Sequence, residues 1–182
     1  MDKPILILIY LFLQFLYVPL NRRPVKYYWK LALDNRLPLV PGMIVIYLSY
    51  YVMFFFGGLW LIFSAHFFAF IKVMIAAQLM SDLFWWLFPN GVKRPKVVGQ
   101  SLLKNWLSKL YCHDKYDGNG APSAHVFHTL IIGTFLTRLW PQWSLVIFIW
   151  MGLIVVSTVL IKQHYVVDVM GGILVAVAAV FF

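Results

Sequence analysis

The sequence predicts an all-α membrane protein with six transmembrane helices. Of its 182 residues, 63% are apolar and 19% aromatic, while only 12% are charged. A soluble domain of this length could not bury so much apolar surface. The apolar residues also gather in runs, and a helix needs about 20 of them to cross a bilayer. We therefore predict one membrane-embedded domain over residues 1–182.

The charged residues are strongly unbalanced. Fifteen Lys and Arg residues stand against six acidic residues, and the formal net charge is +9. This bias suits anionic lipid head groups or phosphate substrates, whereas nucleic acid is not expected as a partner because the basic residues lie in short connectors between apolar runs. The single cysteine, Cys112, excludes an internal disulfide. The acidic residues are scattered, which argues against a two-metal hydrolase, and no cofactor is expected.

The first half of the chain predicts three crossings. Residues 5–18 form a short span or a helix lying partly in the membrane interface. A basic connector with interfacial aromatic residues follows at 21–42, and full-length spans follow at 42–65 and 67–88. Two roles stay open for Asp82 inside the last of these: an ion pair at the connector surface, or a polar contact between helices.

Three tyrosines fall on roughly one face of the second span. They are Tyr47, Tyr50 and Tyr51. We expect them to pack against neighbouring helices, and the alternative is that they line a groove for a lipid tail.

The segment 89–121 is the longest polar stretch of the chain. Within it, apolar residues recur at helical spacing from Leu102 to Tyr111, with Lys104 and Lys109 on the opposite side. This pattern predicts an amphipathic helix lying on the bilayer surface.

The second half predicts three more crossings. After Pro122, which suits the first position of a helix, one helix runs to about Arg138, and further spans cover 141–156 and 165–182. His128 lies one turn beyond the start of the first of these helices. We expect a packed histidine there and not a metal ligand.

Six crossings determine which connectors share a side of the membrane. The connectors 21–42, 89–121 and 157–164 then lie at one surface, and the turns near residues 66 and 140 lie at the other. Residues that are far apart in the sequence can therefore form one site. The candidates are Lys93, Arg94, Ser123, His125, Lys162, His164 and Asp168.

The most informative pair in this set is His164 and Asp168. They are four residues apart, so on a helix they lie on one face. A carboxylate placed there keeps a proton on one imidazole nitrogen and leaves the other free to attack; the alternative is a pair that is hydrogen-bonded for packing. With His125, a basic cluster and a helix N-terminus nearby, the set predicts a phosphate site with an acid and a nucleophile.

Three segments resemble the signatures of the type 2 phosphatidic acid phosphatase superfamily. They are Lys93-Arg94-Pro95, Pro122-Ser123-Ala124-His125, and Ser157 to Asp168, which compare with the family patterns K-x6-R-P, P-S-G-H and S-R-x5-H-x3-D. The likeness is closest to the membrane-embedded branch that includes bacterial lipid phosphatases and inositol phosphorylceramide synthase-like transferases.

Three positions depart from the family patterns. Leu87 stands where the first pattern has Lys, Ala124 replaces the Gly of the second, and Thr158 replaces the Arg of the third. Lys162 could supply the missing charge, although a lysine is a point donor and lacks the forked guanidinium.

The resemblance implies a metal-independent mechanism. His164 would attack phosphorus and form a phosphohistidine, Asp168 would orient His164, and His125 would protonate the leaving alkoxide and then activate water or an acceptor hydroxyl. The phosphate oxygens would be held by Lys93, Arg94, Ser123 and Lys162.

Three functions follow as hypotheses. The leading one is a lipid-phosphate phosphatase acting on a phosphomonoester or pyrophosphate lipid. The second is a lipid head-group phosphotransferase of sphingolipid or inositol-phosphate type, and the third is a non-enzymatic lipid transporter.

The positive-inside rule places the connectors in the cytoplasm, whereas the resemblance implies the extracytoplasmic face. We expect the extracytoplasmic face, because basic residues beside a phosphate site can be explained by phosphate binding and so do not indicate the orientation.

Overall fold

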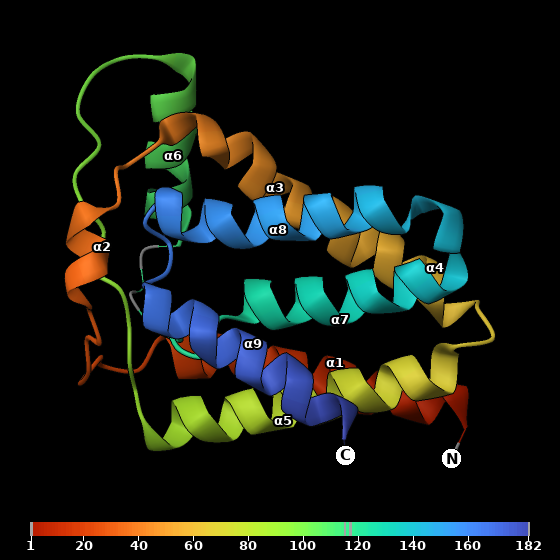
Figure 1. The fold of residues 1–182 in the computed structure, drawn as a ribbon. Coiled ribbons are helices and arrows are strands. Elements are labelled where there is room, and N and C mark those ends of the chain that lie inside the picture. The colour runs from red at the N-terminus through yellow and green to blue at the C-terminus, as the bar shows by residue number, and fades with distance from the viewer. Residues whose placement is uncertain (1, 115, 117, 182) are drawn as a thin grey trace.

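The computed structural model describes residues 2–114, 116 and 118–181, and this part of the chain is helical, with 73% of residues in helices and no named strand (Figure 1). Its only extended pairings are two isolated bridges, Tyr27 with Asn90 and Gly91 with Gly118. The elements are α1 (Lys3–Asn21), α2 (Ala32–Arg36), η1 (Pro41–Met43), α3 (Ile44–Val52), η2 (Met53–Gly57), α4 (Gly58–Ile62), α5 (Phe67–Leu87), α6 (Leu102–His113), α7 (Ala124–Leu139), η3 (Pro141–Trp143), α8 (Ser144–Leu160) and α9 (Val166–Val180).

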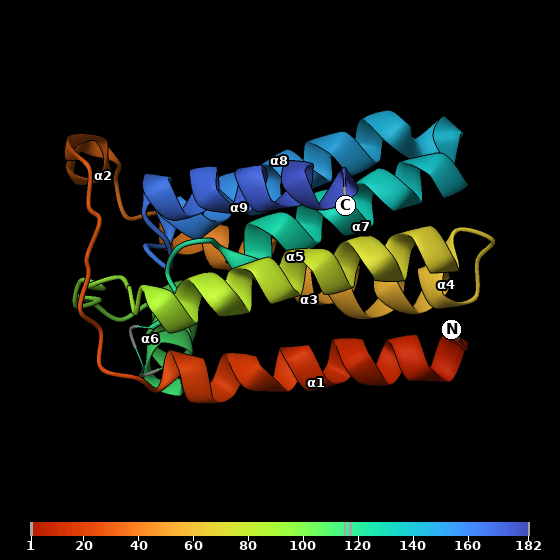
Figure 2. The same cartoon turned by 90° about the horizontal axis from the view of Figure 1, so that it is seen from below.

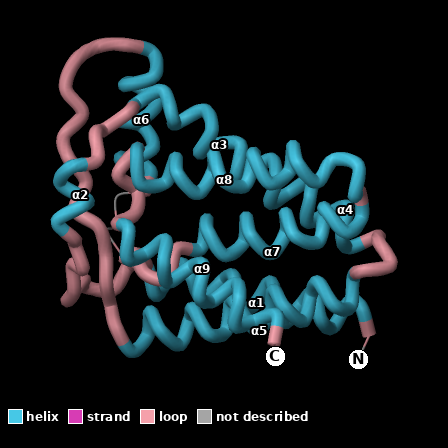
Figure 3. Tube along the Cα trace, in the orientation of Figure 1, coloured by secondary structure: helices cyan, strands magenta, loops and turns pink. Residues whose placement is uncertain are grey.

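The long helices run side by side in one bundle, and the connectors gather at one of its ends. Figures 1 and 2 show α1, α3 with α4, α5, α7, α8 and α9 along the bundle, while α2 and α6 lie at the end where α7 and α9 begin. The tube in Figure 3 shows most of the loop segments at this same end, which we call the connector end. Hydrogen bonds join the segments there, for example from Val40 N to Leu160 O at 2.9 Å. The three connectors thus lie at one end of the bundle, as predicted, and that this end faces one membrane surface stays a prediction.

In the described part of the chain, four helical segments are long and apolar enough to cross a membrane, which indicates a membrane protein. They are Lys3–Asn21, Pro41–Ile62, Phe67–Leu87 and Pro141–Leu160. The other two expected spans are shorter. Helix α9 has 15 residues, or about 22 Å at 1.5 Å per residue, and α7 has 16 residues with several polar side chains.

Helix α7 lies in the middle of the bundle, and its packing positions the residues at its start. It contacts α5, α8, α9 and η2, and its side chains Phe127, Ile132 and Phe135 are buried. Two glycines let neighbouring helices approach it. A Cβ at Gly57 would lie 3.1 Å from Ile132, and one at Gly133 would collide with Met151.

The amphipathic helix predicted within 89–121 is present as α6. It begins at Ser101, whose side chain accepts a hydrogen bond from Lys104 N at 3.3 Å, as an N-cap does. Leu107 is fully buried and packs in one cluster with Ile44 and Tyr47, while Lys109 is exposed. Helix α6 therefore turns its apolar face toward the connector end of the bundle.

Candidate active site

His164 and Asp168 meet where α9 begins. The His164 Nδ1 atom lies 3.4 Å from Asp168 Oδ2, and both residues are buried. His164 stands in the turn before α9, so the pair joins a loop to a first helical turn and does not share a helix face as the spacing had suggested. The same carboxylate oxygen accepts a hydrogen bond from Tyr165 N at 2.8 Å. This bond fixes the carboxylate at the helix N-terminus, where negative charge is favoured.

The second histidine of the predicted site faces the first. His125 is the second residue of α7, and its Nδ1 atom lies 3.4 Å from His164 Nε2. The two imidazole ring centroids are 5.5 Å apart. The starts of α7 and α9 are joined by a hydrogen bond from Ser123 N to Asp168 O at 2.9 Å. Two helix N-termini therefore meet beside the histidines, and such ends favour a bound anion.

A tyrosine from α3 lies at hydrogen-bond distance from one histidine of this pair. The Tyr47 hydroxyl oxygen lies 2.7 Å from His125 Nε2, and Tyr47 is only 2% exposed. These contacts fit one arrangement of protons. If His164 carries its proton on Nδ1, on the side of the Asp168 carboxylate, then His164 Nε2 accepts from His125 Nδ1, and His125 Nε2 accepts from the Tyr47 hydroxyl. Sequence reasoning placed Tyr47 among packing residues and missed this bond, because the periodicity of a span says nothing about hydrogen-bond partners.

Arg94 and Lys93 lie at the connector end but already have partners there. The Arg94 Nη2 atom forms an ion pair with Asp114 Oδ2 at 2.7 Å, and its Nη1 atom donates to the Asp114 carbonyl. The Lys93 ammonium lies 4.6 Å from the centre of the Tyr28 ring, and Lys93 N donates to the Tyr165 hydroxyl at 3.1 Å. Lys93 is thus tied to the residue next to His164. Phosphate binding by both residues stays a prediction.

Lys162 reaches toward the connector 21–42. Its ammonium donates to the carbonyl oxygens of Asp34 and Leu37, at 3.0 and 2.7 Å. Burial lowers the pKa of Lys162, which the nearby Asp34 carboxylate partly opposes and Lys30 reinforces. In this arrangement Lys162 holds the turn before α9 against α2, and its predicted role as a phosphate ligand would require the ammonium to leave these carbonyls.

Ser123 is the predicted phosphate ligand whose placement fits best. It is fully buried at the N-terminal cap of α7, and among the described residues no group hydrogen-bonds to its Oγ atom. An unsatisfied buried hydroxyl costs free energy. A phosphate oxygen at the start of α7 would satisfy it.

Two further polar residues position the site, and sequence reasoning assigned a role to neither. Asn90 is 2% exposed; its side chain donates to Ala121 O at 2.7 Å and accepts from Ala121 N. It therefore holds the loop that leads into Ser123. Asp34 is also buried, and its Oδ1 atom accepts from Val166 N at 2.9 Å, at the start of α9. The sequence offers one clue to Asn90, because the dipeptide Asn90-Gly91 is typical of a turn.

A buried polar chain crosses the bundle below the histidine pair. The His128 Nδ1 atom lies 2.9 Å from the Tyr50 hydroxyl, and its Nε2 atom lies 2.9 Å from Gln14 Nε2. Gln14 donates to Gln78 Oε1 at 3.2 Å, and Gln78 donates to Asp82 Oδ1 at 2.8 Å. His128 is thus hydrogen-bonded within the core, as expected of a packed histidine. Asp82 accepts its hydrogen bond from Gln78 of the same helix, α5, and the contact to another helix is made by Gln78 with Gln14. No described basic residue forms an ion pair with Asp82.

Comparisons of the chain with family models, with curated proteins and with solved structures return no match. The fold and the site define the class: an all-helical membrane protein in which two histidines and an aspartate meet at the connector end of a helical bundle.

Proposed function

We propose that the protein is a membrane lipid-phosphate phosphatase that hydrolyses a phosphomonoester or pyrophosphate lipid through a phosphohistidine. The observation that carries this proposal is the position of His164, with Asp168 at 3.4 Å from one ring nitrogen and His125 at 3.4 Å from the other. This arrangement suits a nucleophile with its orienting carboxylate and a separate acid. The resemblance to the type 2 phosphatidic acid phosphatase superfamily supports the same roles.

In the first step, His164 Nε2 attacks phosphorus. A nitrogen–phosphorus bond forms while the bond from phosphorus to the lipid oxygen breaks. His125 Nδ1 gives its proton to the leaving oxygen as Nε2 takes the proton of the Tyr47 hydroxyl, so the His125 ring stays neutral, and that proton returns to Tyr47 in the second step. Asp168 stabilises the positive charge that develops on the His164 ring, because its carboxylate faces the Nδ1–H group. Tyr47 keeps the transferable proton of His125 on Nδ1.

In the second step, water replaces the lipid. His125, now without its Nδ1 proton, takes a proton from a water molecule, and the water oxygen attacks the phosphorus of the phosphohistidine. The nitrogen–phosphorus bond breaks and inorganic phosphate leaves. The oxygens of the transferred group would be held by the Ser123 hydroxyl and the amides at the start of α7, with the charges of Lys93, Arg94 and Lys162 nearby.

The proposal includes six membrane crossings, with α7 and α9 as the short ones, and a site on the extracytoplasmic face. Cys112 tests the orientation because it is exposed on α6, at the connector end, and is the single cysteine of the sequence. A membrane-impermeant thiol reagent added to sealed vesicles of known orientation should label it from the extracytoplasmic side. Labelling from the cytoplasmic side alone would contradict the proposed orientation.

A substrate screen tests the activity. The purified protein in detergent would be offered phosphatidic acid, a prenyl pyrophosphate, or ceramide together with a phospholipid donor, and free phosphate and new lipids would be measured. We expect phosphate release from the first or the second substrate and none from the His164→Ala variant. Head-group exchange without phosphate release would favour the transferase, and full activity of His164→Ala would rule out the phosphohistidine.

A further inference from the structure

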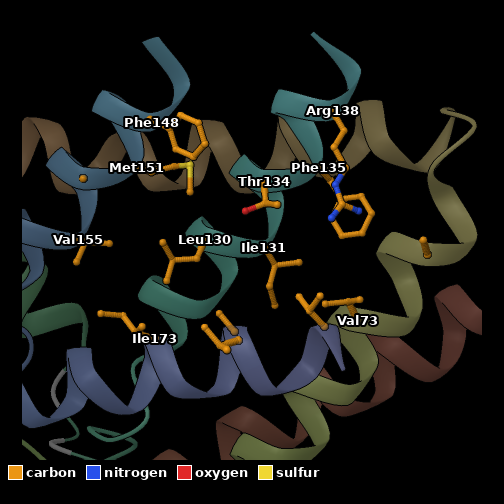
Figure 4. A pocket seen from close by; sticks show the side chains of 15 residues that line it. Val73, Leu130, Ile131, Thr134, Phe135, Arg138, Phe148, Met151, Val155 and Ile173 are labelled. Carbon is orange, nitrogen blue, oxygen red and sulfur yellow. The ribbon is translucent and has the colours of Figure 1, made fainter. Parts of the chain in front are cut away.

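An apolar groove opens in the half of the bundle that lies away from the histidine pair. It has a volume of about 650 Å³ and lies between α5, α7, α8 and α9. Figure 4 shows side chains from several helices around it, among them Val73, Leu130, Met151 and Ile173. Its size is within the range of about 300–1,000 Å³ that is typical of ligand sites.

One basic side chain, Arg138, lies at the end of this groove. Arg138 lies in the last turn of α7, and its guanidinium carbon is 4.9 Å from the centre of the Phe135 ring. Figure 4 shows the side chain turned back along α7 beside Phe135, as helix side chains lean toward the N-terminus. Within the described part of the chain, no carboxylate lies at ion-pair distance from it. An arginine in such a place favours an anionic partner.

Basic side chains outnumber acidic ones near Arg138. Lys72 is exposed in the second turn of α5, next to the groove residue Val73. Of the acidic residues that the structure describes, Asp2 alone belongs to this end of the bundle. The groove thus combines an apolar wall with the Arg138 guanidinium at its end, which matches an acyl chain attached to an anionic head group.

We infer that this groove binds an anionic glycerophospholipid from the leaflet opposite the histidine pair. One acyl chain would lie along α7, α8 and α9, and the lipid phosphate would accept hydrogen bonds from the Arg138 guanidinium. The site is separate from the proposed active site and performs no chemistry, so it does not depend on the proposed reaction; its place in the opposite leaflet rests on the six crossings proposed above.

A second groove of the same bundle provides an internal control. It has a volume of about 330 Å³ between α1, η2, α4 and α5, and no lysine or arginine lines it. Each groove contains a glycine whose added Cβ would meet nothing within 4 Å, Gly152 in the first and Gly58 in the second. A Cβ at either position therefore has open space, and a leucine there adds bulk to a residue that lines the groove.

Native mass spectrometry in detergent tests the inference with phosphatidylglycerol and phosphatidylcholine as probes. Both are phosphodiesters, so neither is a substrate of the proposed phosphatase. We expect the wild-type protein to bind phosphatidylglycerol about tenfold more tightly than phosphatidylcholine. Arg138→Gln should remove this preference, and Arg138→Lys should retain part of it. Gly152→Leu should weaken the binding of both lipids, while Gly58→Leu should leave the preference intact.

Three results would overturn the inference: equal binding of the two lipids by the wild-type protein, a preference that survives Arg138→Gln, or an equal loss of binding in Gly58→Leu and Gly152→Leu. The second result would place the lipid elsewhere, for example at the histidine pair. Arg138 is exposed, and its side chain forms no hydrogen bond with the described residues, so Arg138→Gln decides the matter even if a leucine variant fails to fold. None of these outcomes bears on phosphate release.

Discussion

Replacing Tyr47 with phenylalanine tests the proton assignment at the proposed active site. The change removes the hydroxyl that lies 2.7 Å from His125 Nε2 and keeps the ring that packs with Ile44 and Leu107. Without this donor, His125 can carry its proton on Nε2, and Nδ1 then has no proton to give to the leaving oxygen. The fold should be preserved, because the apolar contacts of the ring remain.

The size of the effect follows from the lost hydrogen bond. An unsatisfied buried acceptor costs about 1–3 kcal/mol, and each 1.36 kcal/mol of barrier corresponds to about a tenfold change in rate. We therefore expect kcat to fall roughly tenfold to hundredfold in Tyr47→Phe. KM should change by less than about twofold, because the proton of His125 is needed in the transition state and not for binding.

Tyr50→Phe is the matched control. This variant also removes a tyrosine hydroxyl from α3, one turn further along the helix. The Tyr50 oxygen, however, lies 2.9 Å from His128 Nδ1, so its partner is His128 and not His125. This variant should melt at a lower temperature and keep kcat within about twofold of the wild-type value. The assay is steady-state phosphate release from the substrate found in the screen. An unchanged kcat in Tyr47→Phe, or an equal fall in both variants, would refute the assignment.

Three more variants test other parts of the site. His164→Ala should reduce turnover at least about a thousandfold while the melting temperature stays near that of the wild type, since a nucleophile is lost; a smaller fall would contradict the covalent mechanism. Asn90→Ala should lower the free energy of unfolding by about 2–4 kcal/mol, because the amide and carbonyl of Ala121 both lose a buried partner; thermal unfolding in detergent measures it, and a loss below about 0.5 kcal/mol would be inconsistent with the bonds described. Lys162→Met should speed amide hydrogen exchange over residues 32–37 without raising KM; the reverse result would show that Lys162 is a phosphate ligand.

The architecture could be predicted to a large extent because apolar runs and helical periodicity are local properties. The apolar run at 67–88 appears as α5, and the spacing of apolar residues from Leu102 to Tyr111 appears as α6. The meeting of three connectors at one end followed from the alternation of crossings. The lengths of α7 and α9 did not follow, because the positions of helix ends depend on capping and on the packing of neighbouring loops.

The candidate site could be predicted by residue type but not by geometry. The spacing of His164 and Asp168 brought them together, although one lies before the helix and the other in its first turn. The direction of Lys162 could not be foreseen, since its partners are carbonyl oxygens more than a hundred residues away. The hydrogen bonds of Tyr47 and Asn90 could not be predicted for the same reason, because their partners belong to other elements and are brought close by tertiary packing.

The central place of α7 has a consequence for how the protein enters the membrane. This helix carries two histidines, several threonines and an arginine, and it is not among the segments apolar enough to cross a bilayer on their own. Contact with lipid would leave these polar groups without partners. With the six proposed crossings, α7 would therefore enter the membrane together with α5 and α8, and the starts of α7 and α9 would meet beside the histidines only after that assembly.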